Sequence, residues 1–459
     1  MEMVFLVGML GLAIFAAILA RPLFGACLFL FGNPLLVGIA RGEIGTVLRP
    51  NEILLLFILG AISLRILLLM VCARYKAPRF DSMDAALLAL VATGSALPLV
   101  LQQIRNISPS ADDLLYAAVL VKYYALFRLF RGCVRNEADV LVCLKVSFAA
   151  AALVAVVAIL QVAHFFGIAE FLLAYYDSPF EGHQGVITTR ATSTIASTFG
   201  FGDLMIINLV AVLALMRLRN RVNWTLGSAA VLFLVGCVVS GTISVYLGLA
   251  VALLAFGLLT RSLHRLLPAS IAAAAVAALA FWPVIENRLE GFTRLSGMPS
   301  SWEGRQANLE RLVLPALAWN DKWLFGVQPA PRIPAPEAWR EMVYIESGYL
   351  WLLWIGGVPF LLAFFGFTAF ALYRLAQVAR RRTDVVECAA TAGFCWVAAM
   401  AVLMLFDPHL TIRGGADLFF PLLALALVPA ASTRQSAPHT ILPERFCQPG
   451  LEKDLAWKR

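Results

Sequence analysis

Long apolar stretches alternate with short polar connections along the whole chain. A helix that crosses a membrane needs about 20 mainly apolar residues, and the sequence contains 12 or 13 stretches that fit this template. They lie near residues 3–20, 23–40, 51–73, 84–104, 112–130, 140–167, 201–216, 224–240, 243–260, 266–285, 347–373, 386–406 and 415–432. The pattern predicts an all-α polytopic membrane protein with 12–13 transmembrane helices, in which residues 1–433 form a single transmembrane domain.

Lysine and arginine concentrate in every second connection between the apolar stretches. Because cytoplasmic loops carry an excess of basic residues, these connections are predicted to face the cytoplasm. The same alternation places the two long connections, near residues 168–200 and 286–346, on the outer face and residues 434–459 in a cytoplasmic tail. Basic residues near the start of the chain give conflicting signals, so the side of residue 1 stays open.

The composition agrees with a membrane protein and excludes two other classes. Of 459 residues, 61% are hydrophobic and 14% charged, whereas a soluble domain is about half apolar and a quarter charged, so a soluble globular enzyme is excluded. The net charge of +8 comes from short connections without a basic stripe interleaved with aromatic residues, so no nucleic-acid partner is expected. The eight cysteines form no CxxC pair and have no histidine at metal-ligand spacing. We therefore expect no metal site, and without a GxGxxG fingerprint or P-loop we expect no cofactor.

Arg65 is a charged residue in the middle of the apolar stretch at residues 51–73. A charge near the bilayer centre costs at least about 2.5–3.5 kcal/mol, so we expect Arg65 to have a partner inside the helix bundle. Interhelix pairing and phosphate binding both remain open, and Arg65 is a candidate substrate-binding residue.

The first long outer connection ends in ITTRATSTIASTFGFGD, where threonine and serine surround Arg190. A guanidinium suits bidentate recognition of phosphate, so Arg190 is a candidate anion-binding residue; the alternative is a surface arginine that only marks the topology. His183 precedes it in the same connection. His183 is either a further substrate-binding residue or an exposed loop residue.

The second long connection far exceeds the usual 2–8 residues between helices, and its aromatic residues argue against disorder. The Ser300-Ser301-Trp302-Glu303 sequence has the spacing of a capping box. It predicts a helix near residues 301–319 on the membrane surface, kinked at Pro315. Trp302 and the other aromatic side chains either stack on sugar faces or lie in the interfacial aromatic belt.

Three candidates lie near the ends of outer connections. Glu346 precedes the apolar stretch at residues 347–373, where it either caps a helix or acts as an outward-facing general base. Tyr349 follows it in the sequence ESGYL and is a candidate substrate-binding residue. Arg413, in the last outer connection (DPHLTIR), adds a further cation.

The order of several loose motifs resembles the O-antigen ligase and Wzy-type polysaccharide polymerase superfamily. The resemblance covers roughly residues 140–373 and the overall helix count. It is carried by Arg190 before Ser197-Thr198-Phe199-Gly200, Ser240-Gly241-Thr242, Gly304-Arg305, Trp323-Leu324-Phe325-Gly326, and Ser347, Tyr349 and Leu350 ahead of Gly356-Gly357-Val358-Pro359.

The resemblance implies a metal-independent, inverting glycosyltransferase of the bacterial inner membrane that acts on a glycan carried by undecaprenyl pyrophosphate. It implies that Arg190 and Arg305 hold the pyrophosphate leaving group in place of a divalent metal. The chain departs from the family where His-Asn is common and Glu346-Ser347 stands instead. Glu346 then replaces the histidine as the group that accepts the acceptor's proton.

Three functions remain open at this point. The first is a polymerase that joins lipid-linked repeat units. The second is a ligase that moves the finished glycan to another acceptor. The third is a polysaccharide transporter without chemistry, which is typically built from inverted repeats and broken helices. The resemblance also implies a flippase and a chain-length regulator as partner proteins.

Overall fold

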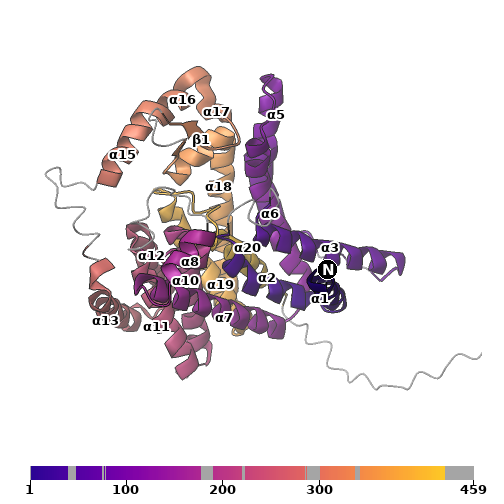
Figure 1. Cartoon of the computed structure of the whole chain (residues 1–459), viewed down its shortest axis with the longest axis vertical. Coiled ribbons are helices and arrows are strands. Elements are labelled where there is room, and N and C mark those ends of the chain that lie inside the picture. Colours follow the sequence, from indigo (N-terminus) through magenta and orange to yellow (C-terminus); the bar gives the residue numbers. More distant parts are fainter. Residues whose placement is uncertain are drawn as a thin grey trace, which may run out of the picture.

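The computed structural model describes residues 2–39, 48–74, 77, 79–176, 190–219, 223–284, 286, 300–335 and 342–429. This part of the chain is almost entirely helical (Figure 1). The α-helices are α1 (Glu2–Ala20), α2 (Pro22–Leu36), α3 (Pro50–Val71), α4 (Ser82–Val91), α5 (Leu97–Ile104), α6 (Ala111–Cys133), α7 (Glu137–Val162), α8 (Ile168–Tyr175), α10 (Thr198–Arg219), α11 (Trp224–Val239), α12 (Ile243–Thr260), α13 (Leu263–Ala280), α15 (Ser300–Asn308), α16 (Leu314–Ala318), α17 (Lys322–Phe325), α18 (Gly348–Arg381), α19 (Val385–Leu403) and α20 (Gly415–Leu425). Shorter turns are the π-turns η1 (Ala92–Ala96) and η3 (Leu309–Val313) and the 3-10 turns η2 (Ser193–Ile195) and η4 (Trp319–Asp321).

The helical character predicted from the apolar stretches is confirmed, since each stretch coincides with a helix. In the described part of the chain, seven helices are long and apolar enough to cross a membrane. They are Pro50–Val71, Ser82–Ile104, Glu137–Val162, Thr198–Arg219, Ile243–Thr260, Gly348–Arg381 and Val385–Leu403. Four further apolar helices are shorter than this. The count of 12–13 spans, the sidedness of the loops and the cytoplasmic tail at residues 434–459 stay predictions, and that tail lies outside the described residues.

Helix α10 forms the centre of the bundle. Its apolar stretch is 83% buried, compared with 17% for α3 at the periphery. α10 packs against α11, α12, α19 and α20. An apolar helix that is buried on all sides belongs to the interior of a bundle, so a polar residue on α10 lies among other helices and away from lipid.

Helix α18 is a hairpin of two helical arms, and the prediction of one continuous span over residues 347–373 is wrong. Gly357 has φ 64° and ψ −156°, a conformation outside the helical region. The ring centroid of Tyr349 lies 6.0 Å from that of Phe364 and 5.7 Å from that of Phe365. In a straight helix with a rise of 1.5 Å per residue, Tyr349 and Phe364 would be about 22 Å apart. Residues 348–356 therefore fold back along residues 358–381.

The sequence Gly356-Gly357-Val358-Pro359 explains the reversal. Glycine adopts a positive φ without a steric penalty, and Pro359 lacks the N–H that would continue the helical hydrogen bonds. The second arm alone, residues 358–381, rises about 36 Å at 1.5 Å per residue, which exceeds the hydrocarbon core of about 30 Å. It is long enough to span a membrane without the first arm.

The tip of this hairpin is covered by residues 324–327 of the long connection. Val327 N donates to Trp354 O at 2.6 Å. A Cβ on Gly357 would lie 2.3 Å from Leu324 O, and one on Gly326 would lie 2.3 Å from Ile355 O. The backbones after α17 and at the reversal of α18 thus lie so close together that only glycine fits at positions 326 and 357.

The long connection contains the predicted helix, divided into pieces. α15, η3 and α16 cover residues 300–318, which confirms the helix predicted near residues 301–319. Pro315 lies in the first turn of α16, directly after η3, so the helix is interrupted there as predicted. α15, α16 and α17 form an arch at the top of the view in Figure 1. The sequence did not predict the short antiparallel hairpin of β1 (Arg332–Pro334) and β2 (Met342–Tyr344) that follows.

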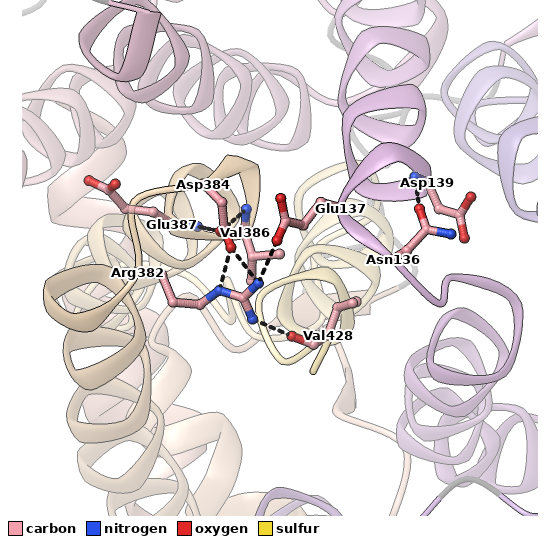
Figure 2. A network of polar contacts seen from close by, with 8 residues as sticks. All are labelled: Asn136, Glu137, Asp139, Arg382, Asp384, Val386, Glu387 and Val428. Atoms are coloured by element: carbon pink, nitrogen blue, oxygen red, sulfur yellow. Dashed lines mark hydrogen bonds and ion pairs between the residues drawn. The ribbon is translucent and has the colours of Figure 1, made fainter. Parts of the chain in front are cut away.

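Arg382, which follows α18, joins the ends of α7, α19 and α20 through ion pairs and hydrogen bonds (Figure 2). Arg382 donates to Asp384 Oδ2 at 2.8 Å, to Val428 O after α20 at 2.8 Å, and to Glu137 Oε1 in the first turn of α7 at 3.3 Å. Asp384 Oδ1 accepts from Val386 N at 2.9 Å and so caps α19. Among the effects on Asp384, burial raises its pKa, but hydrogen bonds from Arg382 contribute to a net lowering, so the carboxylate stays charged.

Candidate active site

Arg305 of α15 forms ion pairs with two carboxylates from other parts of the chain. Its Nε lies 2.5 Å from Glu346 Oε2, and its Nη2 lies 3.7 Å from Asp407 Oδ2. The side chains of Arg305 and Glu346 are 26% and 32% exposed, and that of Asp407 is 12% exposed. The cluster is therefore open enough for a ligand to reach Arg305 and Glu346, while Asp407 supports the guanidinium from a more buried position.

The first arm of the α18 hairpin positions Glu346. Ser347 is the N-cap residue of α18, and its side chain makes no capping hydrogen bond. Tyr349 N donates to Met404 O at 3.2 Å, at the end of α19. A Cβ on Gly348 would lie 2.8 Å from Asp407 O. Glu346 thus stands two residues before the start of α18, paired with Arg305, and the close approach of Gly348 holds it beside the α19–α20 connection.

That connection, residues 404–414, is held by three other helices. Tyr123 of α6 donates its hydroxyl to Thr411 O at 3.2 Å. Lys122, the preceding residue, forms a 3.0 Å ion pair with Asp417 in the first turn of α20. On the α10 side, a Cβ on Gly200 would lie 2.0 Å from Arg413 O. The connection carrying Asp407 is therefore fixed between α6, α10 and the α18 hairpin.

A buried histidine and aspartate lie behind Asp407. His409 Nδ1 lies 2.8 Å from Asp203 Oδ2, and neither side chain is exposed. Burial alone would lower the pKa of His409, but the Asp203 carboxylate and Asp407 more than offset it, so the pKa of His409 is raised. Burial raises the pKa of Asp407, and the charges of Arg305 and His409 offset only part of that rise. Acidic and basic side chains therefore alternate from Asp203 on α10 to the partly exposed Arg305–Glu346 pair.

Arg190 lies beside the turn that connects α11 to α12. Its side-chain carbons cover Gly241, where a Cβ would lie 2.8 Å from Arg190 Cγ. Ala191 N donates to Val239 O at 3.0 Å. Gln161 of α7, which is fully buried, accepts from Thr192 N at 3.1 Å and from Ser193 N at 2.9 Å. The segment that follows Arg190 is thereby fixed to both α7 and α11.

The remaining predicted site residues lie at several places. Arg65 donates to the carbonyls of Leu19 and Ala20 at the end of α1, so its partner in the bundle is a helix terminus. The Tyr349 hydroxyl donates to Ala401 O at 2.6 Å, inside the helix packing. Arg413 Nη1 donates to Val37 O at 3.4 Å, after α2. His183 lies outside the described residues, as does the side chain of Trp302.

Three residues were not among those proposed from the sequence: Asp407, which belongs to the cluster, and Asp203 and His409, which lie behind it. A signal for Asp203 was available, because it is an acid inside the apolar stretch FGFGDLMIINLV, and an ionisable residue within a membrane helix indicates a functional site by default. Asp407 and His409 stand in a short polar connection with no motif spacing. Only the fold brings them together with α10 and α15.

The cluster combines an anion-binding group with proton acceptors. A guanidinium with five N–H donors binds phosphate oxygens in a planar, bidentate arrangement, and a carboxylate accepts a proton from a hydroxyl. Among the residues that the structure describes, no three His, Cys, Asp or Glu side chains are grouped so as to hold a metal ion.

No protein-family model matches the chain, and no curated protein matches it.

Proposed function

We propose that this protein is a polysaccharide polymerase that joins undecaprenyl-pyrophosphate-linked repeat units at the outer face of the bacterial inner membrane. The observation that carries the proposal is the pairing of Arg305 with Glu346 and Asp407, two carboxylates that lie at the ends of the long apolar helices α18 and α19. A lipid-linked donor needs a diphosphate-binding cation and a proton acceptor beside a membrane-spanning bundle, and this cluster supplies both.

In the proposed reaction, an acceptor sugar hydroxyl attacks the anomeric carbon of the donor from the face opposite the diphosphate. The new C–O bond forms as the bond to the diphosphate oxygen breaks, with inversion at that carbon. The hydroxyl proton passes to Glu346, and undecaprenyl pyrophosphate leaves. Arg305 stabilises the negative charge that grows on the leaving oxygen, with Arg190 as the second diphosphate ligand.

The ion pair between Arg305 and Glu346 supports this proposed reaction. A bound diphosphate competes with the Glu346 carboxylate for the Arg305 guanidinium, 2.5 Å away. Once Arg305 turns to the diphosphate, Glu346 loses its ion pair with Arg305 and becomes a better proton acceptor. Asp407, at 3.7 Å from Nη2, keeps the guanidinium in place during the exchange.

Two alternative functions are a ligase and a transporter. A ligase would carry out the same transfer to a different acceptor, so the cluster favours both enzymes equally. A transporter is favoured by the break of α18 at Gly357, because discontinuous helices form transporter binding sites. Against it, the backbone of Leu324 to Val327 packs on this break, so its polar groups are used within the protein.

Reconstitution in liposomes separates the three functions. The purified protein is given an undecaprenyl-pyrophosphate-linked repeat unit, and the products are separated on a gel. A ladder of multiples supports the polymerase, and a single band that shifts only when a lipid A core is added supports the ligase. Movement of an unchanged substrate across the bilayer supports the transporter. A flippase and a chain-length regulator are the proposed partners in the cell and are absent from this assay.

A further inference from the structure

The Asp203–His409 pair is sealed within the bundle behind the cluster. Neither side chain is exposed. The ring of Phe199, also on α10, meets the His409 ring edge-on, with 6.4 Å between centroids. A Cβ on Gly415, at the start of α20, would lie 2.6 Å from Asp203 Cβ. Neither a sugar nor a diphosphate can reach this pair, so it acts through its neighbours.

Polar atoms of the pair and of Asp407 are buried without a hydrogen-bond partner in the described structure. His409 Nε2 and Asp203 Oδ1 are buried and have no hydrogen-bond partner among the described residues, and neither has Asp407 Oδ2. Buried polar groups without hydrogen-bond partners destabilise a folded protein. A charged imidazolium in contact with the Asp203 carboxylate gains Coulomb attraction that a neutral pair lacks.

We propose that His409 is a positioning residue, held as an imidazolium by Asp203, that keeps Asp407 ionised and directed at Arg305. This proposal rests on the proposed function, in which Arg305 binds the donor diphosphate. The charged groups that face His409 in the described structure are Asp203 from α10 and Asp407 on its own connection, with Arg305 of α15 beyond Asp407. The diphosphate affinity of Arg305 would then depend on a proton held inside the bundle.

The electrostatics give the direction of the effect. Because burial raises the pKa of Asp407 and His409 opposes that rise, a neutral His409 lets Asp407 take up a proton more readily. A neutral Asp407 no longer holds the guanidinium, and Arg305 moves to Glu346 alone. Activity therefore declines as pH rises through the raised pKa of His409, above the ~6.5 of an ordinary imidazole.

The test is the pH profile of polymer formation in liposomes for the wild type, Asp203→Asn and His409→Gln. We expect the wild-type rate to fall on the basic side. Asp203→Asn keeps the hydrogen bond to Nδ1 but removes the charge that raises the pKa of His409, so the basic limb moves by about one pH unit or more towards acid. His409→Gln has about a tenfold lower kcat/KM at neutral pH and no such limb. His264→Gln, an exposed histidine on α13, is the matched control and keeps the wild-type profile.

A second measurement does not depend on activity. Solid-state 15N NMR of histidine-labelled protein in liposomes reports the charge of His409, with His409→Gln assigning the signal. An imidazolium at pH 7 that becomes neutral in Asp203→Asn supports the proposal. A neutral His409 at pH 7 overturns it whatever the enzyme does, and so does a basic limb that survives in His409→Gln. A charged His409 in a protein that makes no polymer at any pH shows that the proposed function has failed, and the positioning role falls with it.

Discussion

The guanidinium of Arg305 and the carboxylate of Glu346 form an ion pair in which Nε lies 2.5 Å from Oε2, and this contact joins α15 to the last residue of the long connection. Arg305 lies on α15, and Glu346 lies two residues before the start of the α18 hairpin. The arch of α15, α16 and α17 is thus tied to the start of α18 by an ion pair. Its two residues are those to which we assign leaving-group stabilisation and proton acceptance.

Glu346→Gln tests the proton acceptor. Glutamine is isosteric and still hydrogen-bonds Arg305, but it cannot take the acceptor's proton. A lost general base lowers the rate by about 10²–10⁴-fold, so we expect kcat to fall in this range at unchanged expression. The rate of polymer formation in liposomes measures it, with Glu303→Gln, an exposed residue on α15, as the control. Wild-type turnover in Glu346→Gln would leave Glu346 as an ion-pair partner without a chemical role.

Chelation tests the use of arginine in place of a metal. Since the proposed diphosphate ligands are guanidinium groups, EDTA should leave the rate of polymer formation unchanged. The assay compares liposomes with EDTA, with EDTA followed by excess Mg²⁺, and with neither. Loss of turnover in EDTA and its return with Mg²⁺ would contradict the arginine-based mechanism.

Gly357→Ala tests the hairpin. An alanine at φ 64° is strained, at about 1–3 kcal/mol for a sparsely populated conformation, and its Cβ would meet Leu324 O at 2.3 Å. We expect a lower midpoint of thermal unfolding and reduced activity, because Glu346 is attached to this arm. Gly366→Ala, on the second arm, is the matched control, since a Cβ there meets nothing within 4 Å. Equal midpoints for the two variants would show that the tip is looser than its contacts indicate.

Gln161→Leu tests the anchoring of the segment beside Arg190. Leucine has a similar volume but leaves the Thr192 and Ser193 amides without their acceptor, which costs about 1–3 kcal/mol for each unsatisfied group. The midpoint of thermal unfolding should fall, as followed by size-exclusion chromatography after heating. Gln306→Leu, at an exposed position on α15, should change it little. A wild-type midpoint for Gln161→Leu would mean that the segment is held by other contacts.

Elements that depend on local composition could be predicted from the sequence. Elements that depend on the close approach of one backbone segment to another were missed. Apolar length alone located the helices, and the capping-box spacing at Ser300 located the helix of the long connection. The reversal at Gly357 was missed because a continuous apolar stretch gives the same hydropathy whether it is straight or folded back. The Gly356-Gly357-Val358-Pro359 signal was present, since glycine and proline together interrupt helices.

Two residues of the candidate site could be predicted from the sequence, but their meeting in one cluster could not. Arg305 and Glu346 were both chosen from their local sequence, yet nothing in that sequence states that they meet. The Asp203–His409 contact links α10 to the last connection, and such a long-range pairing follows from helix packing alone. Arg65 was chosen because a buried charge needs a partner, and that partner is the carbonyl end of α1.

The most direct measurement compares the wild type with Arg305→Lys in liposomes that contain the lipid-linked repeat unit. Lysine keeps the positive charge but loses the planar fork that reaches Glu346 and Asp407 together. We predict a ladder of multiples from the wild type and a rate lower by about 10²-fold, or about 2.7 kcal/mol, in Arg305→Lys. The control Arg311→Lys, an exposed residue in η3, should give the wild-type ladder. A full ladder from Arg305→Lys would remove Arg305 from the site, and a single unchanged band from the wild type with intact, accessible substrate would contradict polymerisation itself.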